Sequence, residues 1–372
     1  MRIFTLLLPV AFLLPAASAQ KINDVVLKKD GSRVRGLEIT EFLLSGVRGT
    51  RGNDPFELPA HQVMDIEWSD VPEEFLSGKA AMNRGDFQVA AQLFGAVTSN
   101  RPLIKADAEF FKIKSAVASV GTDKGAAATA AEHAKSWLSA NANHWRTPEA
   151  MLLAGRSQRL AGTAGTATAT LKDLEERAIT DGFGGTWSAR AKYELALTLI
   201  ADGKGMQARS QFKSAGNSAS DALGTASTSD KSDLQSIVTL SRVGEGETYL
   251  IDKDYKTAES FFSKLAGSKE MALKAAGRAG EGQAIFESAK ASKSDNDLRR
   301  AQLALAKASV LDSSNGEASA KANYFLGLCL IELGPEKEGD SFKQRAQAYF
   351  EIVYTSYPTT QWASLAKAAA AK

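Results

Sequence analysis

The sequence predicts a mainly α protein in which a long helical solenoid follows a small all-β, barrel-like module. Three observations lead to this prediction. The composition changes near residue 72, from a stretch rich in Val, Ile and Gly to one crowded with Ala, Leu, Lys and Glu. Short apolar runs separated by turn residues fill the segment before this boundary. After it, a fixed spacing of small and large apolar residues recurs four times.

The first residues have the pattern of a cleavable secretory signal. Arg2 precedes the apolar run 6–14, and small residues at 17–19 form an Ala-x-Ala cleavage site. Prolines interrupt a run that is already short for a bilayer, so a retained transmembrane anchor is the weaker alternative. We expect residues 1–19 to be removed as a signal peptide. The exported chain would begin at Gln20 and stay soluble in the periplasm or another extracytoplasmic space.

Residues 20–70 are expected to form the small β module. Asp30-Gly31 is a strong hairpin signal between its first two strands, and Trp68 ends it with a large apolar residue. The expected strands are 25–27, 33–39, 42–47, 56–58 and 63–68. They resemble an SH3-like or Sm-like barrel, which at this size is expected to pack on the first helices. Two roles stay open: binding peptide or wall material, or capping the solenoid.

The solenoid is expected to start at Pro72, because proline followed by two acids suits the first turn of a helix. Within each helix pair, a small residue is followed by another small residue 12 positions on, a large one at 16 and a further apolar one at 19. The four sets are Gly78, Ala90, Phe94 and Val97; Gly155, Ala167, Leu171 and Leu174; Ala196, Ala208, Phe212 and Ala215; and Gly246, Ala258, Phe262 and Leu265. Gly85 and Gly203 mark turns between paired helices.

This spacing resembles the tetratricopeptide repeat, a pair of antiparallel helices in about 34 residues whose small residues lie where the helices touch. The resemblance covers residues 72–372 and makes the expected fold a tetratricopeptide-type α-solenoid. Segments 322–327 and 346–350 are also similar to exported repeat proteins of bacterial envelopes, including the outer-membrane assembly and cell-division-coordinating subfamilies. The resemblance implies a chain that binds other proteins and catalyses nothing.

Several stretches depart from the repeat. Residues 109–141 read as a degenerate, alanine-rich unit whose second helix lacks the usual aromatic residue. Residues 216–233 are small and polar, and they read as a mobile loop between units. Residues 359–372 are expected to form a terminal helix, with Trp362 and Leu365 packing inward.

The last two units contain an insertion of seven residues. The spacing of 12 becomes 19, from Gly282 to Ala301 and from Gly327 to Ala346. Either both helices lengthen by about two turns and keep their apolar faces in phase, or a loop protrudes. Our hypothesis is that this edge, including residues 335–341, makes contacts with a partner.

No group of residues in the sequence forms a recognisable catalytic or metal site. His61, His133 and His144 are scattered without metal-ligand spacing, and Cys329 lies in an apolar run where a buried, unreactive thiol is expected. We expect no enzyme activity, no cofactor and no metal. Lys plus Arg total 45 against 43 Asp plus Glu, and this near-neutral balance argues against nucleic acid as a partner.

Stacked helix pairs form a concave surface, lined mainly by the first helix of each pair, that suits an extended peptide or a partner helix. Candidate protein-binding residues are polar side chains on those first helices, outside the packing pattern. They are Lys79, Arg84, Lys112, Arg156, Arg159, Lys192 and Glu194. Most are basic, which suits an acidic or carboxylate-ended ligand.

The expected function is that of an exported scaffold or adaptor that organises a protein complex in the cell envelope or periplasm. Two alternatives stay open: a structural envelope component that assembles into a homo-oligomer, and an exported enzyme whose site the sequence does not display. The expected partners are proteins or peptides, without nucleic acid and without a direct membrane span.

Overall fold

The structure, a computed structural model, describes residues 22–311, 316–334 and 339–371. The predicted signal peptide therefore lies outside the described residues. Five strands come first: β1 (Asp24–Lys28), β2 (Arg33–Leu43), β3 (Gly46–Arg51), β4 (Asp54–Pro59) and β5 (Val63–Glu67), with the short 3-10 helix η1 (Ala60–Gln62) before β5. Helices follow to the end of the described chain. The prediction of a mainly α protein with a small β module in front is confirmed.

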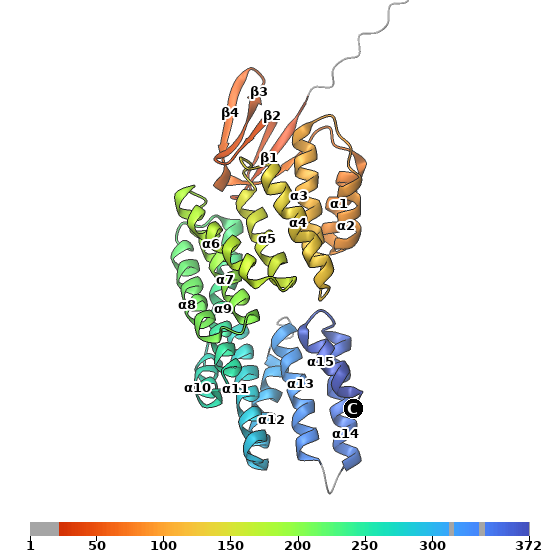
Figure 1. Cartoon of the computed structure of the whole chain (residues 1–372), viewed down its shortest axis with the longest axis vertical. Coiled ribbons are helices and arrows are strands. Elements are labelled where there is room, and N and C mark those ends of the chain that lie inside the picture. Colours follow the sequence, from red (N-terminus) through yellow and green to blue (C-terminus); the bar gives the residue numbers. More distant parts are fainter. Residues whose placement is uncertain (1–21, 312–315, 335–338, 372) are drawn as a thin grey trace, which may run out of the picture.

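The helices lie in tandem along the chain. They are α1 (Glu73–Arg84), α2 (Phe87–Ala96), α3 (Pro102–Ser119), α4 (Lys124–Ala140), α5 (Thr147–Leu160), α6 (Ala164–Thr180), α7 (Gly185–Ala201), α8 (Gly205–Ala222), α9 (Thr228–Ile251), α10 (Tyr255–Ala266), α11 (Met271–Ser292), α12 (Asp295–Leu311), α13 (Gly316–Leu333), α14 (Gly339–Ser356) and α15 (Gln361–Ala370). Each packs chiefly against its neighbours in the sequence. The sheet lies at one end of this array and α14 at the other (Figure 1).

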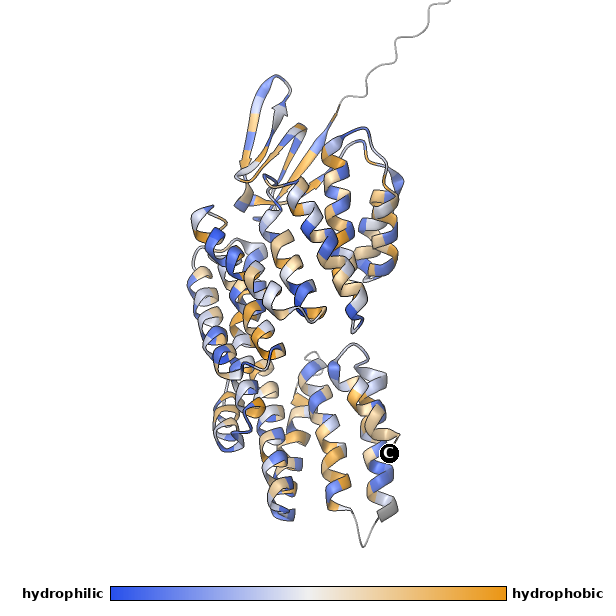
Figure 2. Ribbon diagram, viewed as in Figure 1, coloured by the Kyte–Doolittle hydropathy of each residue, from blue (hydrophilic) through white to orange (hydrophobic). Residues whose placement is uncertain are grey.

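The odd-numbered helices form a continuous layer of their own. Besides their sequence neighbours, α3 contacts α5, α5 contacts α7, and the series continues through α9, α11 and α13 to α15. Apolar and polar residues are interspersed along the helices (Figure 2), as expected for helices that bury one face and expose the other. This two-layer arrangement is that of a helical solenoid, in which each unit buries its apolar face against the next.

The sheet is antiparallel, with strand order β4-β3-β2-β1-β5. The turn predicted at Asp30-Gly31 joins β1 to β2, and Gly31 there has a φ of 88°. The small all-β module is confirmed as a five-stranded antiparallel sheet, and since β4 and β5 are its two edges, it is an open sheet and not a closed barrel. Two prolines, Pro55 and Pro59, lie on the β4 edge, where missing N–H groups discourage pairing with another strand.

One predicted strand was wrong. The stretch 42–47 is divided by a turn at residues 44–45, because β2 continues to Leu43 and β3 starts at Gly46. Gly46 crosses β4 so closely that a Cβ there would stand 2.2 Å from the Leu58 carbonyl oxygen. The Ser45-Gly46 pair was predicted to lie within one strand. Ser45 instead lies in the turn, and Gly46 starts β3 at a point where the two backbones approach closely.

The repeat spacing corresponds to direct contacts between paired helices. A Cβ built on Gly78 would meet the Phe94 ring at 3.0 Å, and one on Gly155 would meet Leu171 at 2.6 Å. The same holds for Gly246 against Phe262, at 2.5 Å. The small residue of the first helix and the large residue 16 positions later are thus packed against each other, as predicted.

The lengthened units keep this contact at a longer separation. Gly282 packs on Leu305 and Gly327 packs on Phe350, each 23 positions apart, which is the usual 16 plus the seven inserted residues. Between α11 and α12 only residues 293–294 are outside a helix, so in that unit the helices lengthen. Of the hypothesised contact segment, residues 335–338 lie outside the described residues and 339–341 fall in α14.

The polar segment 216–233 was predicted as a loop, and this was wrong. It is helical except at residues 223–227. Ala219 and Ala222 are buried along α8, and Ser227 caps α9 by accepting a hydrogen bond from the backbone N–H of Asp230 at 3.3 Å. Small residues were read there as turn formers, whereas burial against neighbouring helices makes them helix interfaces.

Two smaller predictions also need correction. The unit expected at 109–141 is the regular pair α3 and α4, which starts earlier, with Pro102 at its first helical position. Its second helix does carry a buried aromatic residue, Trp137. In α15, Trp362 packs inward as expected, but Leu365 is 44% exposed, because it lies at the edge of the buried face that Trp362, Ala363 and Ala366 form.

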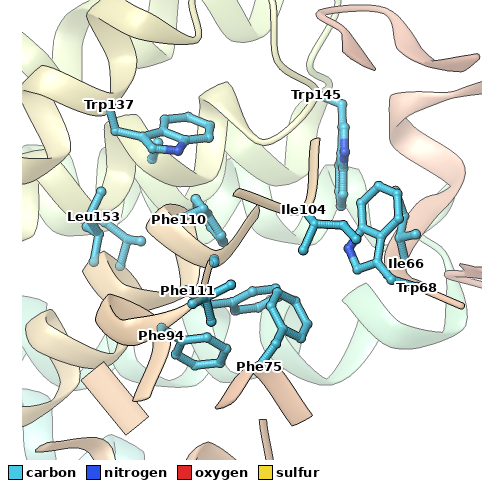
Figure 3. Close-up of a cluster of buried hydrophobic side chains, with 14 of the residues drawn as sticks. Ile66, Trp68, Phe75, Phe94, Ile104, Phe110, Phe111, Trp137, Trp145 and Leu153 are labelled. Atoms are coloured by element: carbon cyan, nitrogen blue, oxygen red, sulfur yellow. The ribbon is translucent and has the colours of Figure 1, made fainter. Parts of the chain in front are cut away.

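The β module shares one core with the first helices. Ile66 and Trp68 pack beside Ile104 of α3, and the rings of Phe75, Phe94 and Phe111 cluster next to them (Figure 3). Arg101, at the start of α3, donates to the buried carboxylate of Asp24 in β1, at 2.9 Å to Oδ1. The expected packing of the module on the first helices is confirmed.

Candidate binding surface

Two hollows of the described chain are lined mainly by odd-numbered helices. The N-terminal hollow, with a volume of about 560 Å³, lies between the β module and α3, α5, α7 and the start of α9. The C-terminal hollow, of about 460 Å³, is lined by α7, α9, α11, α13 and α15. Helix α7 contributes to both, through Trp187 and Arg190 to the first and through Tyr193 and Leu197 to the second. First helices of the pairs thus supply most of the helical lining of both hollows.

The walls of the N-terminal hollow combine apolar and aromatic side chains with charges. The β module contributes Leu44, Ala60, Val63 and the exposed Met64; the solenoid contributes Phe87, Val117, Trp145, Leu152, Phe183 and Trp187. Five bases and three acids line the same space: Lys29, Lys114, Arg146, Arg156 and Arg190 against Glu149, Asp181 and Asp230. The side chains that face the hollow therefore carry a net positive charge.

Two of these bases, Arg146 and Arg156, pair with acids that do not line the hollow. The other three pair with the lining acids Glu149 and Asp230. Arg146, only 3% exposed, donates from Nε to Asp107 at 2.8 Å and from Nη2 to Asp65 at 2.7 Å. Neither aspartate lines the hollow. The Trp68 indole also donates to Asp107, at 3.1 Å, and Lys79 pairs with Asp65. This buried network ties β5 to α1, α3 and the start of α5.

The two aspartates of the network differ in how they ionise. Burial raises the pKa of Asp107, which is enclosed completely. Burial also acts to raise the pKa of Asp65, but the charges of Arg146 and Lys79 outweigh it and hold that pKa below its ordinary value. The Arg146 guanidinium lies 4.1 Å from the centre of the Trp145 ring, a cation–π contact that keeps it in place.

A second set of contacts joins the β module to the far side of the hollow. Lys29, at the end of the first hairpin, donates from Nζ to Asp230 of α9 at 3.0 Å, and its carbonyl accepts from the Ser229 N–H at 3.3 Å. Arg190 of α7 also donates to Asp230, at 3.2 Å. We call the Lys29, Asp230 and Arg190 contact the latch. Because Lys29 and Asp230 are 201 positions apart in the sequence, the latch joins the β module to α9 and completes the wall of the hollow.

The predicted binding residues fall in different places. Arg156 lines the N-terminal hollow. Both Arg156 and Arg159 form ion pairs with Glu194, which is 3% exposed, and Arg159 Nη2 lies 3.2 Å from Glu194 Oε2. These three therefore form one cluster between α5 and α7. Lys79 is held by Asp65 and lies over the Phe111 ring at 3.8 Å.

The other three predicted residues lie elsewhere. Arg84 is exposed at the end of α1 and pairs with Asp86 at 3.0 Å. Lys112 lies against Gly95 of α2. Lys192 donates to Ser218 of α8 at 2.7 Å, so it faces the even-numbered layer. The residues that the structure adds to the site, chiefly Trp145, Arg146, Trp187, Arg190 and Lys29, were not singled out from the sequence.

A local signal for some of them was present. Trp145-Arg146 and Trp187 through Arg190 place an aromatic ring and a guanidinium next to each other at the start of a first helix. Such pairs are common at binding surfaces. Lys29 gave no such signal, because its partner lies in a distant helix.

The residues considered for chemistry sit apart from one another. His61 and His133 are exposed, whereas burial lowers the pKa of His144 to about 2 and keeps its ring neutral. Cys329 is fully buried, and burial raises the pKa of its thiol to about 12. Within the described ranges, no three His, Cys, Asp or Glu side chains gather closely enough to hold a metal ion.

No protein-family model matches the chain, and no curated protein is significantly similar to it. Among the helices in the part of the chain that the structure describes, none has both the length and the apolar character needed to cross a lipid bilayer.

Proposed function

We propose that this protein is an exported, non-enzymatic scaffold that binds a segment of a partner protein on the inner surface of its solenoid. The observation that carries the proposal is the N-terminal hollow, a recess with apolar, aromatic and charged walls that two independent sets of buried contacts hold in shape. A recess formed before binding costs the ligand less ordering than a flexible surface would.

The partner segment at this hollow is acidic and apolar. The bases that face the hollow outnumber the acids, and two of them, Arg146 and Arg156, pair with acids that do not line it. Apolar side chains of the segment fit between the rings of Trp145, Phe183 and Trp187. A carboxylate of the same segment gains from the positive charge around Arg156 and Lys114.

Family, location and domain limits belong to the same proposal. The helix pairs are of the tetratricopeptide type, on the evidence of the four matched spacings. The chain is an envelope or periplasmic protein once residues 1–19 are cleaved. Residues 20–70 are the β module and 72–372 the repeat array. In this proposal the β module is one wall of the binding site, which combines the two roles considered for it.

Site-specific photocrosslinking tests the proposal. A photoreactive amino acid replaces Met64 or Ala118, two exposed positions on opposite walls of the N-terminal hollow, and a matched protein carries it at Lys172, exposed on α6 of the other layer. In cells of the source, both hollow positions should crosslink the same segment of one protein, and Lys172 should not.

Two results would contradict the proposal. Equal crosslinking from Lys172 would mean that the inner surface has no special role. Crosslinks only between copies of this chain, with a mass that rises with its concentration, would support the self-assembling structural component instead.

A further inference from the structure

The C-terminal hollow differs in chemistry from the N-terminal one. One face of α9 supplies Leu240, Val243, Glu247 and Ile251, which repeat at helical spacing. Leu240 is 46% exposed and Ile251 is 44% exposed, although both lie in a recess of the inner surface. Leu197 and Ile200 of α7 face them across the space, and Trp362 of α15 lines it from the other end.

Two acids and one base line this hollow: Glu247, Glu317 and Lys321. Lys321, whose side chain is 6% exposed, donates from Nζ to Glu247 at 2.6 Å. The same ammonium lies 5.7 Å from the centre of the Trp362 ring. One lysine thus balances the charge of only one of the two carboxylates, and the side chains that line the hollow carry a net negative charge.

Glu317 is the carboxylate that a bound cation would reach. It stands at the rim, at the start of α13, where it is exposed at one side. Burial of its other side raises its pKa, against the opposing effects of a hydrogen bond from Trp362 and the charge of Lys321. A ligand cation at the rim would favour the ionised form of this group.

We propose that the C-terminal hollow is a second binding site, which takes an apolar segment of a partner protein that carries a lysine or arginine side chain. The apolar side chains of the segment cover Leu240 and Ile251, and its cation pairs with Glu317. The inference rests on the proposed function, because both sites lie on the inner surface of the solenoid. The ligand of the C-terminal hollow is basic, whereas that of the N-terminal hollow is acidic. The scaffold would then hold two different segments, one in each hollow.

The test uses fluorescent peptides of defined composition and the full chain. One peptide alternates leucine and lysine with serine spacers, a second has glutamate in place of each lysine, and a third has serine in place of each leucine. Binding is measured to the full chain that carries Ala118→Glu, a change intended to block the N-terminal hollow. The leucine–lysine peptide should bind this variant at least about tenfold more tightly than either of the other two peptides does. Its affinity should fall as salt is raised.

Matched variants locate the site. Glu317→Gln should weaken binding of the leucine–lysine peptide by about tenfold, and Glu176→Gln, at an exposed glutamate of α6, should leave it unchanged. Leu240→Ser should also weaken binding, whereas Leu303→Ser, at a leucine that is 60% exposed on α12, should not. All four positions are exposed, so the variants are expected to fold.

Failure here is distinguishable from failure of the proposed function. If neither charge nor leucine content matters, or if Glu317→Gln behaves like Glu176→Gln, the second site is wrong. If the peptide responds to Ala118→Glu and not to Glu317→Gln, it binds in the N-terminal hollow. That outcome overturns this inference and leaves an inner-surface scaffold standing.

Discussion

The helices up to α9 and those after it share one packing scheme but differ in what is added to it. Both parts place a glycine under a large side chain, as Gly155 lies under Leu171 in the first part and Gly327 under Phe350 in the second. Only the first part adds the buried network around Arg146 and the latch at Asp230.

Two kinds of contact, one local and one between distant segments, are thus present in the chain. The glycine contacts join residues 16 or 23 positions apart and occur in five of the helix pairs of the described chain, so they hold each pair together locally. The ionic contacts join residues 39, 81 and 201 positions apart, and they hold the β module and the helices around one recess. The first half therefore has a recess bounded by several ionic contacts between distant segments, whereas the C-terminal hollow has one such contact, between Lys321 and Glu247.

The largest effect is expected at Arg146. Arg146→Met should lower the free energy of unfolding by about 3–5 kcal/mol, because Asp107 and Asp65 would lose their main cationic partner in a buried setting. Urea unfolding followed by tryptophan fluorescence measures it, since three of the indoles lie in this core. The matched change Arg48→Met, in an exposed pair with Glu57, should cost at most about 1 kcal/mol. Equal losses in the two variants would show that the buried network contributes no more than an exposed ion pair.

A smaller loss is expected from overpacking the second half. A Cβ on Gly280 would stand 2.4 Å from the Phe262 ring, so Gly280→Ala should cost about 1–3 kcal/mol. Gly165 is the control, because a Cβ there meets nothing within 4 Å, and Gly165→Ala should stabilise the protein by about 0.4–1 kcal/mol. Thermal unfolding followed by circular dichroism measures both. If Gly280→Ala were also stabilising, the close contact would not exist.

The latch should contribute less. Lys29→Ala removes one of the partners of Asp230 and leaves Arg190 and Ser227 in place, so a loss of about 1 kcal/mol is expected. Hydrogen exchange should speed up at the start of α9 and at the first β hairpin. Lys28→Ala, at a neighbour that pairs with the exposed Asp30, should change neither region. Unchanged exchange in the Lys29 variant would mean that the latch does not hold the ring closed.

The smallest effect is a change in acid sensitivity. Burial acts to raise the pKa of Asp230, but its contacts with Lys29 and Ser227 and the charge of Arg190 outweigh this and lower it. A carboxyl whose pKa is lowered by folding stabilises the folded state above its unfolded pKa, near 4, and loses that stabilisation as the pH falls. Asp230→Asn should therefore flatten the decline of the urea midpoint between about pH 5 and pH 3. An unaltered decline would show that Asp230 is not ionised against its partners.

The sequence predicts the repeats because their cause is local. A small residue and a large one at fixed separation meet in any antiparallel helix pair, and so Gly78 with Phe94 was identifiable without a structure. Turns marked by glycine and proline were predictable for the same reason, because these residues act on the local backbone. Polar, small segments were misread where a distant helix buries them, as at Ala219 and Ala222.

The site was less predictable than the fold. Arg156, Arg159 and Glu194 were singled out individually, but their mutual pairing depends on how α5 packs on α7. The latch and the Arg146 network depend on the placement of the whole β module, which no spacing in the sequence encodes. Leu365 was misplaced because the buried face of α15 is narrow and Leu365 lies at its edge.

Hydrogen–deuterium exchange of the full chain, alone and with the protein identified by crosslinking, tests the central claim most directly. An inner-surface scaffold predicts that the partner slows exchange in α3, α5, α7, α9 and the short helix η1, with little change in α4, α6 and α8. Protection confined to the even-numbered helices, or to the outer edge of the sheet at β4, would contradict it.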